Sequence, residues 1–419
     1  MIIHQPEMVK QDDHTIVFAK IEMRHPTINL PEYLWYKVPS HYEQYLSLQS
    51  DAFLVPGLLA GMHFQEAIEV RGSISPRLAY HLDEYQSLLH FRMPKVVTPV
   101  DIKYDQLRAL HGNPIGIGTS FSGGVDSFFT ILKHLPQNQP DPHYQITHAL
   151  FLLGFDIVNA DRSRYQSLYS RFHNALQQIN IDLITLESNM TSLVIPRMDF
   201  NLLFGPVLVG AVHALGGLFQ RFFIPGSIDY HQLKTWVCAS DSTTDPLLST
   251  EILDIIHFGA THKRVEKIKA ICDWDLPQNH LRVCSCTPYE SLNCSKCEKC
   301  VRTLIPLYAL GKMKDFSTFK KPFSSNLDGL RWARKYNPAS PFVKEIIPFI
   351  RKLKPDLVPW LKFASIIGSI RFILLSLIPR FFRKWLSRFG YFVDPQIQDY
   401  AFENLEISRF IKSTKNVGF

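Results

Sequence analysis

The middle of the chain alternates short apolar runs with longer amphipathic segments. Apolar runs that end in glycine or polar residues occupy 115–120, 148–153, 181–186 and 221–225. Segments with helical spacing of apolar positions lie between them, at 126–135, 162–178 and 204–218. Continuous apolar runs are typical of parallel strands whose two faces are both covered. This order therefore predicts an α/β domain with a parallel sheet, in which ligands bind at the carboxyl ends of the strands.

The flanking regions have a different character. Residues 1–112 contain alternating segments such as YLWYKV and AIEVRG, interrupted by prolines, and predict a mixed β-rich N-terminal domain. With 419 residues and 46% hydrophobic content, the chain is long enough for two or three domains. We expect boundaries near 112 and 318, so that 113–318 forms the α/β domain and 319–419 a helical C-terminal region.

The C-terminal region is strongly basic. Residues 320–388 hold 15 Lys or Arg and 3 Asp or Glu, a net +12 in a chain of net +7. An apolar run at 366–378 is broken by Arg371 and ended by Pro379, and is shorter than the roughly 20 residues of a spanning helix, which predicts no transmembrane span. A basic amphipathic helix would contact RNA or an anionic membrane. The alternative is that its apolar residues pack against the preceding domain: Ile366, Ile370, Ile373, Leu374 and Leu377.

The stretch IGIGTSFSGGVDSFFT, at 115–130, joins a predicted strand to a predicted helix. Gly123 and Gly124 lack a Cβ, so the backbone can bend sharply and approach a ligand. The N–H groups at the start of the following helix form an anion site. We therefore expect a phosphate-binding loop made of Ser120, Ser122, Gly123, Gly124, Val125, Asp126 and Ser127.

The polar residues of this loop suggest the chemistry. Ser122 and Ser127 can donate hydroxyl hydrogen bonds to phosphate, and Asp126 can hold the Mg²⁺ that accompanies ATP. Asp126 and Ser127 are the expected catalytic residues. The loop lacks the lysine of the Walker motif, so we expect it to hold the pyrophosphate leaving group, with cleavage between the α- and β-phosphates.

Other polar residues follow the predicted strands. Asp156 and Ser227 come just after two strands and are candidates for adenosine or substrate contact, although ordinary turn chemistry would also explain them. His262, Lys263 and Arg264 form either a solvated basic face or a phosphate clamp. A polar stretch could bind Mg²⁺ or substrate, or serve caps and turns, through Asp241, Asp245, Ser249 and Glu251.

Five of the seven cysteines fall within the 17 residues 284–300. Cys294, Cys297 and Cys300 form two overlapping CxxC pairs that can converge on one metal, and Cys284 or Cys286 is the fourth ligand, with Cys284 favoured. Zn²⁺ is the expected metal, and an iron–sulfur cluster is the alternative. Disulfides are a weaker reading, because the N-terminal MIIHQPEMVK does not resemble a secretory signal and a reducing cytoplasm is expected.

The segment SGGVDS resembles the SGGxDS signature of the N-type ATP pyrophosphatases, and the cysteine site about 160 residues later makes the chain similar to 7-cyano-7-deazaguanine synthases. The resemblance implies an adenine nucleotide alpha hydrolase-like fold, with ATP and Mg²⁺ at the loop and Zn²⁺ on Cys284, Cys294, Cys297 and Cys300. That family has a Gly-Tyr-Pro-Asp-Cys-Arg segment at its purine pocket, whereas 226–251 here reads GSIDYHQLKTWVCASDSTTDPLLSTE. The acceptor is therefore left open.

The expected function is an ATP-dependent ligase that adenylates a carboxylate or amide, releases pyrophosphate and transfers nitrogen to the acceptor. The acceptor would be a small molecule or a protein, and the enzyme would be cytoplasmic, either free or peripheral to a membrane. Two alternatives remain: a tRNA-thiolating enzyme with an iron–sulfur cluster, and a nucleotide-binding sensor without catalysis.

Overall fold

The structure is a computed structural model of the 419-residue chain. It describes residues 1–24, 31–155, 157, 161–193, 200–234, 238–284, 292–334, 340 and 342–376. Asp156 and Cys286 lie outside the described residues, so their predicted roles stay predictions.

Strands from both halves of the chain join one sheet. Its strands are β1 (Ile2–Ile3), β2 (Glu7–Gln11), β3 (His14–Glu22), β4 (Tyr33–Pro39), β5 (Ile68–Ile74), β6 (Ile102–Leu107), β7 (Gly116–Ser120), β8 (His148–Leu153), β9 (Asp182–Ser188), β10 (Phe219–Pro225) and β11 (Asp254–Phe258). Their order is β11-β10-β7-β8-β9-β4-β3-β1-β5-β6, with β2 paired to β3. The molecule is therefore an α/β protein with a mostly parallel sheet, as the sequence predicts.

The five strands from β11 to β9 are parallel to one another. β7 comes first in sequence and lies in the middle, with β8 and β9 on one side and β10 and β11 on the other. This is a doubly wound arrangement, and its switch point is the crevice at the carboxyl ends of β7 and β10. The four apolar runs of the sequence correspond to β7, β8, β9 and β10, each to within about two residues.

The N-terminal strands continue this sheet. β4 pairs antiparallel with β9 through Tyr36 with Ser188 and Lys37 with Glu187. The predicted segments YLWYKV and AIEVRG correspond to β4 and β5. Two long helices, α1 (Asp51–Phe64) and α2 (Pro76–Arg92), also belong to this region and were not predicted from the sequence.

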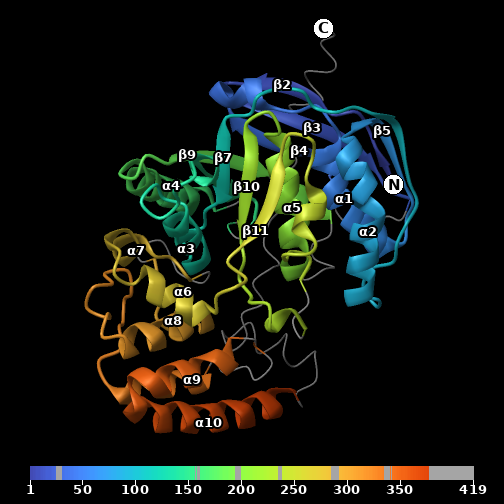
Figure 1. Ribbon diagram of the computed structural model, residues 1–419. Helices are drawn as coiled ribbons and strands as arrows, with labels where there is room; N and C mark the ends of the chain where they lie inside the picture. Colours follow the sequence, from blue (N-terminus) through green and yellow to red (C-terminus); the bar gives the residue numbers. More distant parts are fainter. Residues whose placement is uncertain are drawn as a thin grey trace.

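The remaining helices lie on both sides of the parallel strands and below them in the view of Figure 1. They are α3 (Val125–Lys133), α4 (Arg162–Gln177), α5 (Phe200–Ala214), α6 (Arg264–Ile271), α7 (Asp275–His280), α8 (Glu298–Ala309), α9 (Val343–Leu353) and α10 (Val358–Ser376). Side chains of β8 alternate between two cores, as a strand period of two requires. Leu150 and Leu152 join the core that contains α1 and α5, whereas Ala149, Phe151 and Leu153 join the core that contains α3, α4 and α6.

The C-terminal helices α9 and α10 lie side by side at the bottom of the view in Figure 1. Leu361 and Ala364 of α10 are fully buried. The alternative in which Ile366, Ile370, Ile373 and Leu374 pack against the preceding domain is wrong, because their exposed fractions are 59%, 54%, 58% and 60%. The reason is geometric: α10 turns its Leu361 face toward the protein, so these residues lie on its outer side. Leu377 lies outside the described residues.

The helical stretch Pro355–Leu374, which contains most of α10, is long and apolar enough to cross a membrane by length and composition alone. In its most apolar part, 28% of the residues are buried in the protein. This stretch begins well before the apolar run at 366–378, whose length was the basis for expecting no transmembrane span.

Candidate functional site

The SGGVDS loop lies at the switch point, between the end of β7 and the start of α3. Gly123 has φ of 73°, a left-handed conformation, and a Cβ there would overlap the Phe172 ring of α4. Both facts require glycine. Gly124 is the extended residue that precedes α3. The Ser127 hydroxyl donates to the Gly124 carbonyl at 3.0 Å and helps fix the turn. The N-terminal N–H groups of α3 thus form one wall of the crevice.

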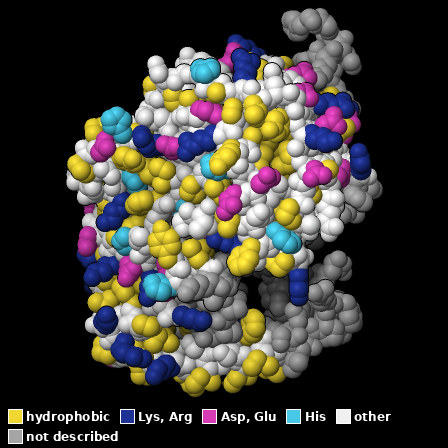
Figure 2. Space-filling model, turned by 45° about the vertical axis from the view of Figure 1, so that its right-hand side comes forward, with side chains coloured by type: hydrophobic (Ala, Val, Ile, Leu, Met, Phe, Trp, Pro, Cys, Tyr) yellow, Lys and Arg dark blue, Asp and Glu magenta, His cyan; other side chains and the backbone are white. Residues whose placement is uncertain are grey.

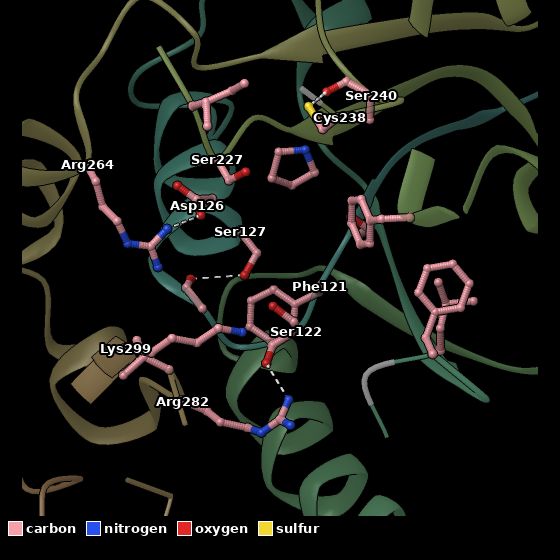
Figure 3. A pocket seen from close by; sticks show the side chains of 18 of the residues that line it. Phe121, Ser122, Asp126, Ser127, Ser227, Cys238, Ser240, Arg264, Arg282 and Lys299 are labelled. Carbon is pink, nitrogen blue, oxygen red and sulfur yellow. Dashed lines mark hydrogen bonds and ion pairs between the residues drawn. The ribbon is translucent and has the colours of Figure 1, made fainter. Parts of the chain in front are cut away.

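This crevice is part of a cavity of about 640 Å³. Most of the predicted loop residues and the predicted strand-end residue line it together: Ser120, Ser122, Gly124, Asp126, Ser127 and Ser227. Val125 is fully buried, so it anchors the loop rather than facing a ligand. Figure 3 shows Asp126, Ser127 and Ser227 in the middle of the cavity.

Among the residues that the structure describes, four cationic side chains also line the cavity: Arg264, Arg282, Lys299 and Arg302. Arg282 Nη1 donates to the Ser122 carbonyl at 3.3 Å, and the Arg282 N–H donates to the Gly123 carbonyl at 2.7 Å, so Arg282 is tied to the loop itself. Arg264 and Arg302 are each only 8% exposed. The expectation of a solvated basic face is therefore wrong for Arg264, which turns inward because its counterion lies inside.

That counterion is Asp126. Its Oδ2 lies 2.5 Å from Arg264 Nη1, and its Oδ1 lies 3.3 Å from Lys267 Nζ. Burial raises the pKa of Asp126, but Arg264 and Lys267 outweigh it and hold the pKa below its usual value. Lys267 is 1% exposed and also donates to the Gly226 carbonyl. Asp126 thus neutralises buried cations in this structure, and Mg²⁺ would have to compete with them for its oxygens.

Residues at the start of α9 contact the cationic side chains that line the cavity. The Phe342 ring lies 3.9 Å from the Arg302 guanidinium carbon, a cation–π contact. Glu345 accepts from the Arg264 N–H at 3.1 Å, and burial raises the pKa of Glu345 to about 7. Burial also lowers the pKa of Arg302 to about 10. The C-terminal region thus contributes directly to the wall of the cavity.

An apolar section of the cavity faces the loop. Leu150, Leu152, Phe155, Phe204 and Ile228 line it, and the Phe155 and Phe204 rings meet edge to face at 5.8 Å. Flat aromatic rings of ligands bind well against such walls.

The polar stretch after β10 has structural partners. Asp245 is fully buried; its Oδ2 accepts from Ser240 Oγ at 2.9 Å and lies 2.7 Å from His257 Nδ1. His257 and Ser240 line the cavity. Asp241 pairs with Arg92. Two further candidates accept backbone N–H groups: Ser249 from Ile255 and Glu251 from Arg77. The cap-and-turn reading is thus the better one for this stretch.

The four predicted cysteine ligands converge. The Sγ atoms of Cys284, Cys294, Cys297 and Cys300 all lie within 4.8 Å of one another. Cys294 and Cys300 are 3.9 Å apart, and Cys284 and Cys297 are 3.7 Å apart. Ligands at about 2.3 Å from one tetrahedral Zn²⁺ would be about 3.8 Å apart. No disulfide links these four cysteines, and their spacing fits a single ion better than a cluster, whose thiolates bind separate irons.

Backbone donors surround these sulfurs. Cys294 Sγ accepts from the N–H groups of Lys296 and Cys297 at 3.4 and 3.3 Å, and Cys297 Sγ accepts from the Cys300 N–H at 3.5 Å. Donors of this kind stabilise thiolates and orient metal ligands. Ser295 adopts φ of 58° between them, which produces the tight turn.

Asn293 holds Cys284, the predicted ligand most distant in sequence, in place, and sequence reasoning missed it. Its Oδ1 accepts from the N–H groups of Val283 and Cys284 at 2.8 and 3.2 Å, while its Nδ2 donates to the Leu281 carbonyl at 2.7 Å. Asn293 is fully buried. Its position next to Cys294 was the only signal in the sequence.

The fold and site define an α/β protein with a glycine-rich loop at the switch point of a doubly wound sheet and a four-cysteine site that fits one metal ion beside it. Comparison with protein-family models, with curated proteins and with solved structures finds no match for this chain. The functional assignment therefore depends on the motifs and their geometry.

Proposed function

We propose that the chain is an ATP-dependent ligase that cleaves ATP to AMP and pyrophosphate, adenylates a carboxylate or amide acceptor, and transfers nitrogen to it. The observation that carries the proposal is the SGGVDS loop lining the switch-point cavity together with Arg264, Arg282, Lys299 and Arg302. Cations and a helix N-terminus around one loop suit a polyphosphate.

The loop would bind the β- and γ-phosphates through the first N–H groups of α3 and the hydroxyl groups of Ser122 and Ser127. An acceptor oxygen attacks the α-phosphorus, the bond to the bridging oxygen breaks, and pyrophosphate leaves with the electron pair. Arg264 and Arg282 stabilise the charge that develops on this leaving group. Donors fixed before reaction contribute most to such stabilisation, because they need no reorganisation.

The apolar section would hold adenine or the acceptor and keep water away from the adenylate. A nitrogen nucleophile then attacks the activated carbon, and AMP leaves with the C–O electron pair. Mg²⁺ supplies further charge neutralisation when bound, and Asp126 is the loop residue that would hold it.

The cysteine site would hold Zn²⁺ structurally, since four thiolates leave no open coordination position. Its place explains why it matters to the cavity: Arg282 precedes Cys284 by two residues, and Lys299 and Arg302 flank Cys300. A metal that fixes these cysteines fixes three of the four cations around the loop.

The spacing of the sulfurs supports this reading over tRNA thiolation with an iron–sulfur cluster. A nucleotide sensor would bind ATP in the same way but would not convert it, so an assay of ATP turnover distinguishes it from the proposed ligase.

The test is exchange of radiolabelled pyrophosphate into ATP, with Mg²⁺ and a cell extract stripped of macromolecules as the acceptor source. We expect exchange with the wild type, at least about tenfold loss in Arg264→Gln, and normal exchange in Arg71→Gln. Arg71 is a matched control because its side chain is 49% exposed and pairs only at the surface, with Glu69. Hydrolysis of the γ-phosphate without exchange would contradict the proposal.

A further inference from the structure

Helix α10 is apolar on both sides. Leu361 and Ala364, both fully buried, face the protein, and Leu361 packs beside Gly329 of the short helix η6 (Asn326–Arg334). The outer side carries a contiguous set of apolar side chains, with exposed fractions between 41% and 60%: Phe363, Ile366, Ile367, Ile370 and Leu374. We call this set the outer face of α10. A helix that is apolar all round is stable when both sides leave water, and a contiguous exposed patch of this kind marks an interaction site.

The exposed charges of α9 and α10 are mostly positive. Lys344, Arg351 and Lys352 of α9 and Lys362 of α10 are exposed. Among the acidic residues at 342–374, Asp356 is exposed, whereas Glu345 is buried. Figure 2 shows the same combination at the bottom of the molecule, where hydrophobic and Lys or Arg side chains dominate. A partner of this region must therefore take apolar side chains and carry negative charge.

We propose that the outer face of α10 docks onto an anionic lipid surface. Its isoleucines and Phe363 enter the boundary between headgroups and acyl chains, while Lys362 and the α9 cations bind lipid phosphates. Peripheral helices bind membranes through this pair of contributions. A nucleic acid would use the cations alone and leave the isoleucines in water, so the lipid surface fits more of the observations.

The helix lies along the surface in this proposal and does not cross the membrane. Leu357, Leu361 and Ala364 belong to the core shared with α8 and α9, and crossing would remove them from it. Docking would also hold the cavity near the lipid, because Phe342 at the start of α9 contacts Arg302 of the cavity wall.

The test is co-sedimentation of the full-length protein with vesicles of phosphatidylcholine alone and with about 30% phosphatidylserine, at about 0.1 M salt. The wild type should sediment with the anionic vesicles and weakly with the neutral ones. The double variant Ile366→Asn and Ile370→Asn should bind anionic vesicles at least about tenfold more weakly, because each buried isoleucine contributes that order of affinity. Both residues are more than half exposed, so the variant should fold normally.

Phe91→Asn is the matched control, since Phe91 is 84% exposed on α2, away from α10. It should bind as the wild type does. Equal binding by the double variant, or no wild-type binding to anionic vesicles, would overturn the proposal. A wild-type dimer in ultracentrifugation that the double variant loses would assign the face to a second copy of the chain and also overturn it. The assay needs no ATP, so its result is independent of the proposed function.

Discussion

Asp126→Asn should destabilise the protein strongly, although it changes almost no volume. The wild-type carboxylate pairs with Arg264 at 2.5 Å and with Lys267 at 3.3 Å, and these cations are only 8% and 1% exposed. Removing the negative charge leaves both buried cations without the carboxylate that pairs directly with their side chains. Breaking a buried pair in this way typically costs about 3–5 kcal/mol of unfolding free energy.

The assay is denaturation by guanidinium near neutral pH, with and without pyrophosphate. Because the pKa of Asp126 is lowered in the fold, its stabilisation is present above the unfolded-state pKa and is lost as pH falls through the folded value. The difference in unfolding free energy between the wild type and the variant should therefore become smaller at acid pH. Pyrophosphate should narrow it too, because the anion takes the place of the carboxylate beside the cations.

Lys267→Met provides the coupling measurement. The double variant Asp126→Asn with Lys267→Met should be less destabilised than the sum of the two single changes, since the second removes a cation that the first leaves unpaired. An Asp126→Asn protein within about 0.5 kcal/mol of the wild type would refute the reasoning, because that is the range of substitutions that touch no buried partner.

Three further predictions concern the metal site and the cavity wall. Cys297→Ser should lose zinc, measured by elemental analysis, and weaken ATP binding because Arg282 is no longer held; Cys272→Ser, outside the four-cysteine site, should keep both. Asn293→Ala should lower the unfolding free energy by about 2 kcal/mol, measured by denaturation, because it leaves buried N–H groups unpaired; an unchanged value would contradict that role. Burial raises the pKa of Glu345 from 4.5 to about 7. The contribution of Glu345 to the unfolding free energy is therefore complete below a pH of about 4.5 and is lost as the pH rises through about 7. Glu345→Gln should therefore lose less stability than the wild type between about pH 5 and pH 8, by about 1–3 kcal/mol, and parallel pH profiles would refute this.

Local patterns in the sequence were enough to predict four of the five parallel strands from β11 to β9, but β11 itself was not predicted. β8 matches its apolar run at both ends, and Gly123 has the conformation that only its lack of a side chain explains well. The convergence of the four cysteines was predictable for the same reason, since three of them lie within seven residues of the sequence. Spacing along a short segment fixes geometry directly.

Helix α1 could not be read from periodicity. Twelve of its 14 residues are buried, so the helix is apolar all round and lacks the 3.6-residue pattern. Helix α2 did carry a signal: Ser75 accepts from the Leu78 N–H, and Pro76 follows it, which is a common helix start.

The inward orientation of Arg264 could not be predicted from the neighbouring sequence, because its counterion Asp126 lies 138 positions away. Charge patterning along a helix shows which faces are charged, but not which charges meet a partner after folding. The choice between the two readings of the apolar run in α10, contact with an external surface or packing within the chain, also required the structure, because the sequence does not show which side of a helix meets the rest of the protein.

Phosphorus NMR of the protein with ATP, Mg²⁺ and a macromolecule-free cell extract tests the proposed cleavage of ATP most directly. We expect AMP and pyrophosphate to accumulate, since the loop is expected to hold the pyrophosphate leaving group. Accumulation of ADP and inorganic phosphate would contradict it, because the bond broken would then lie between the β- and γ-phosphates.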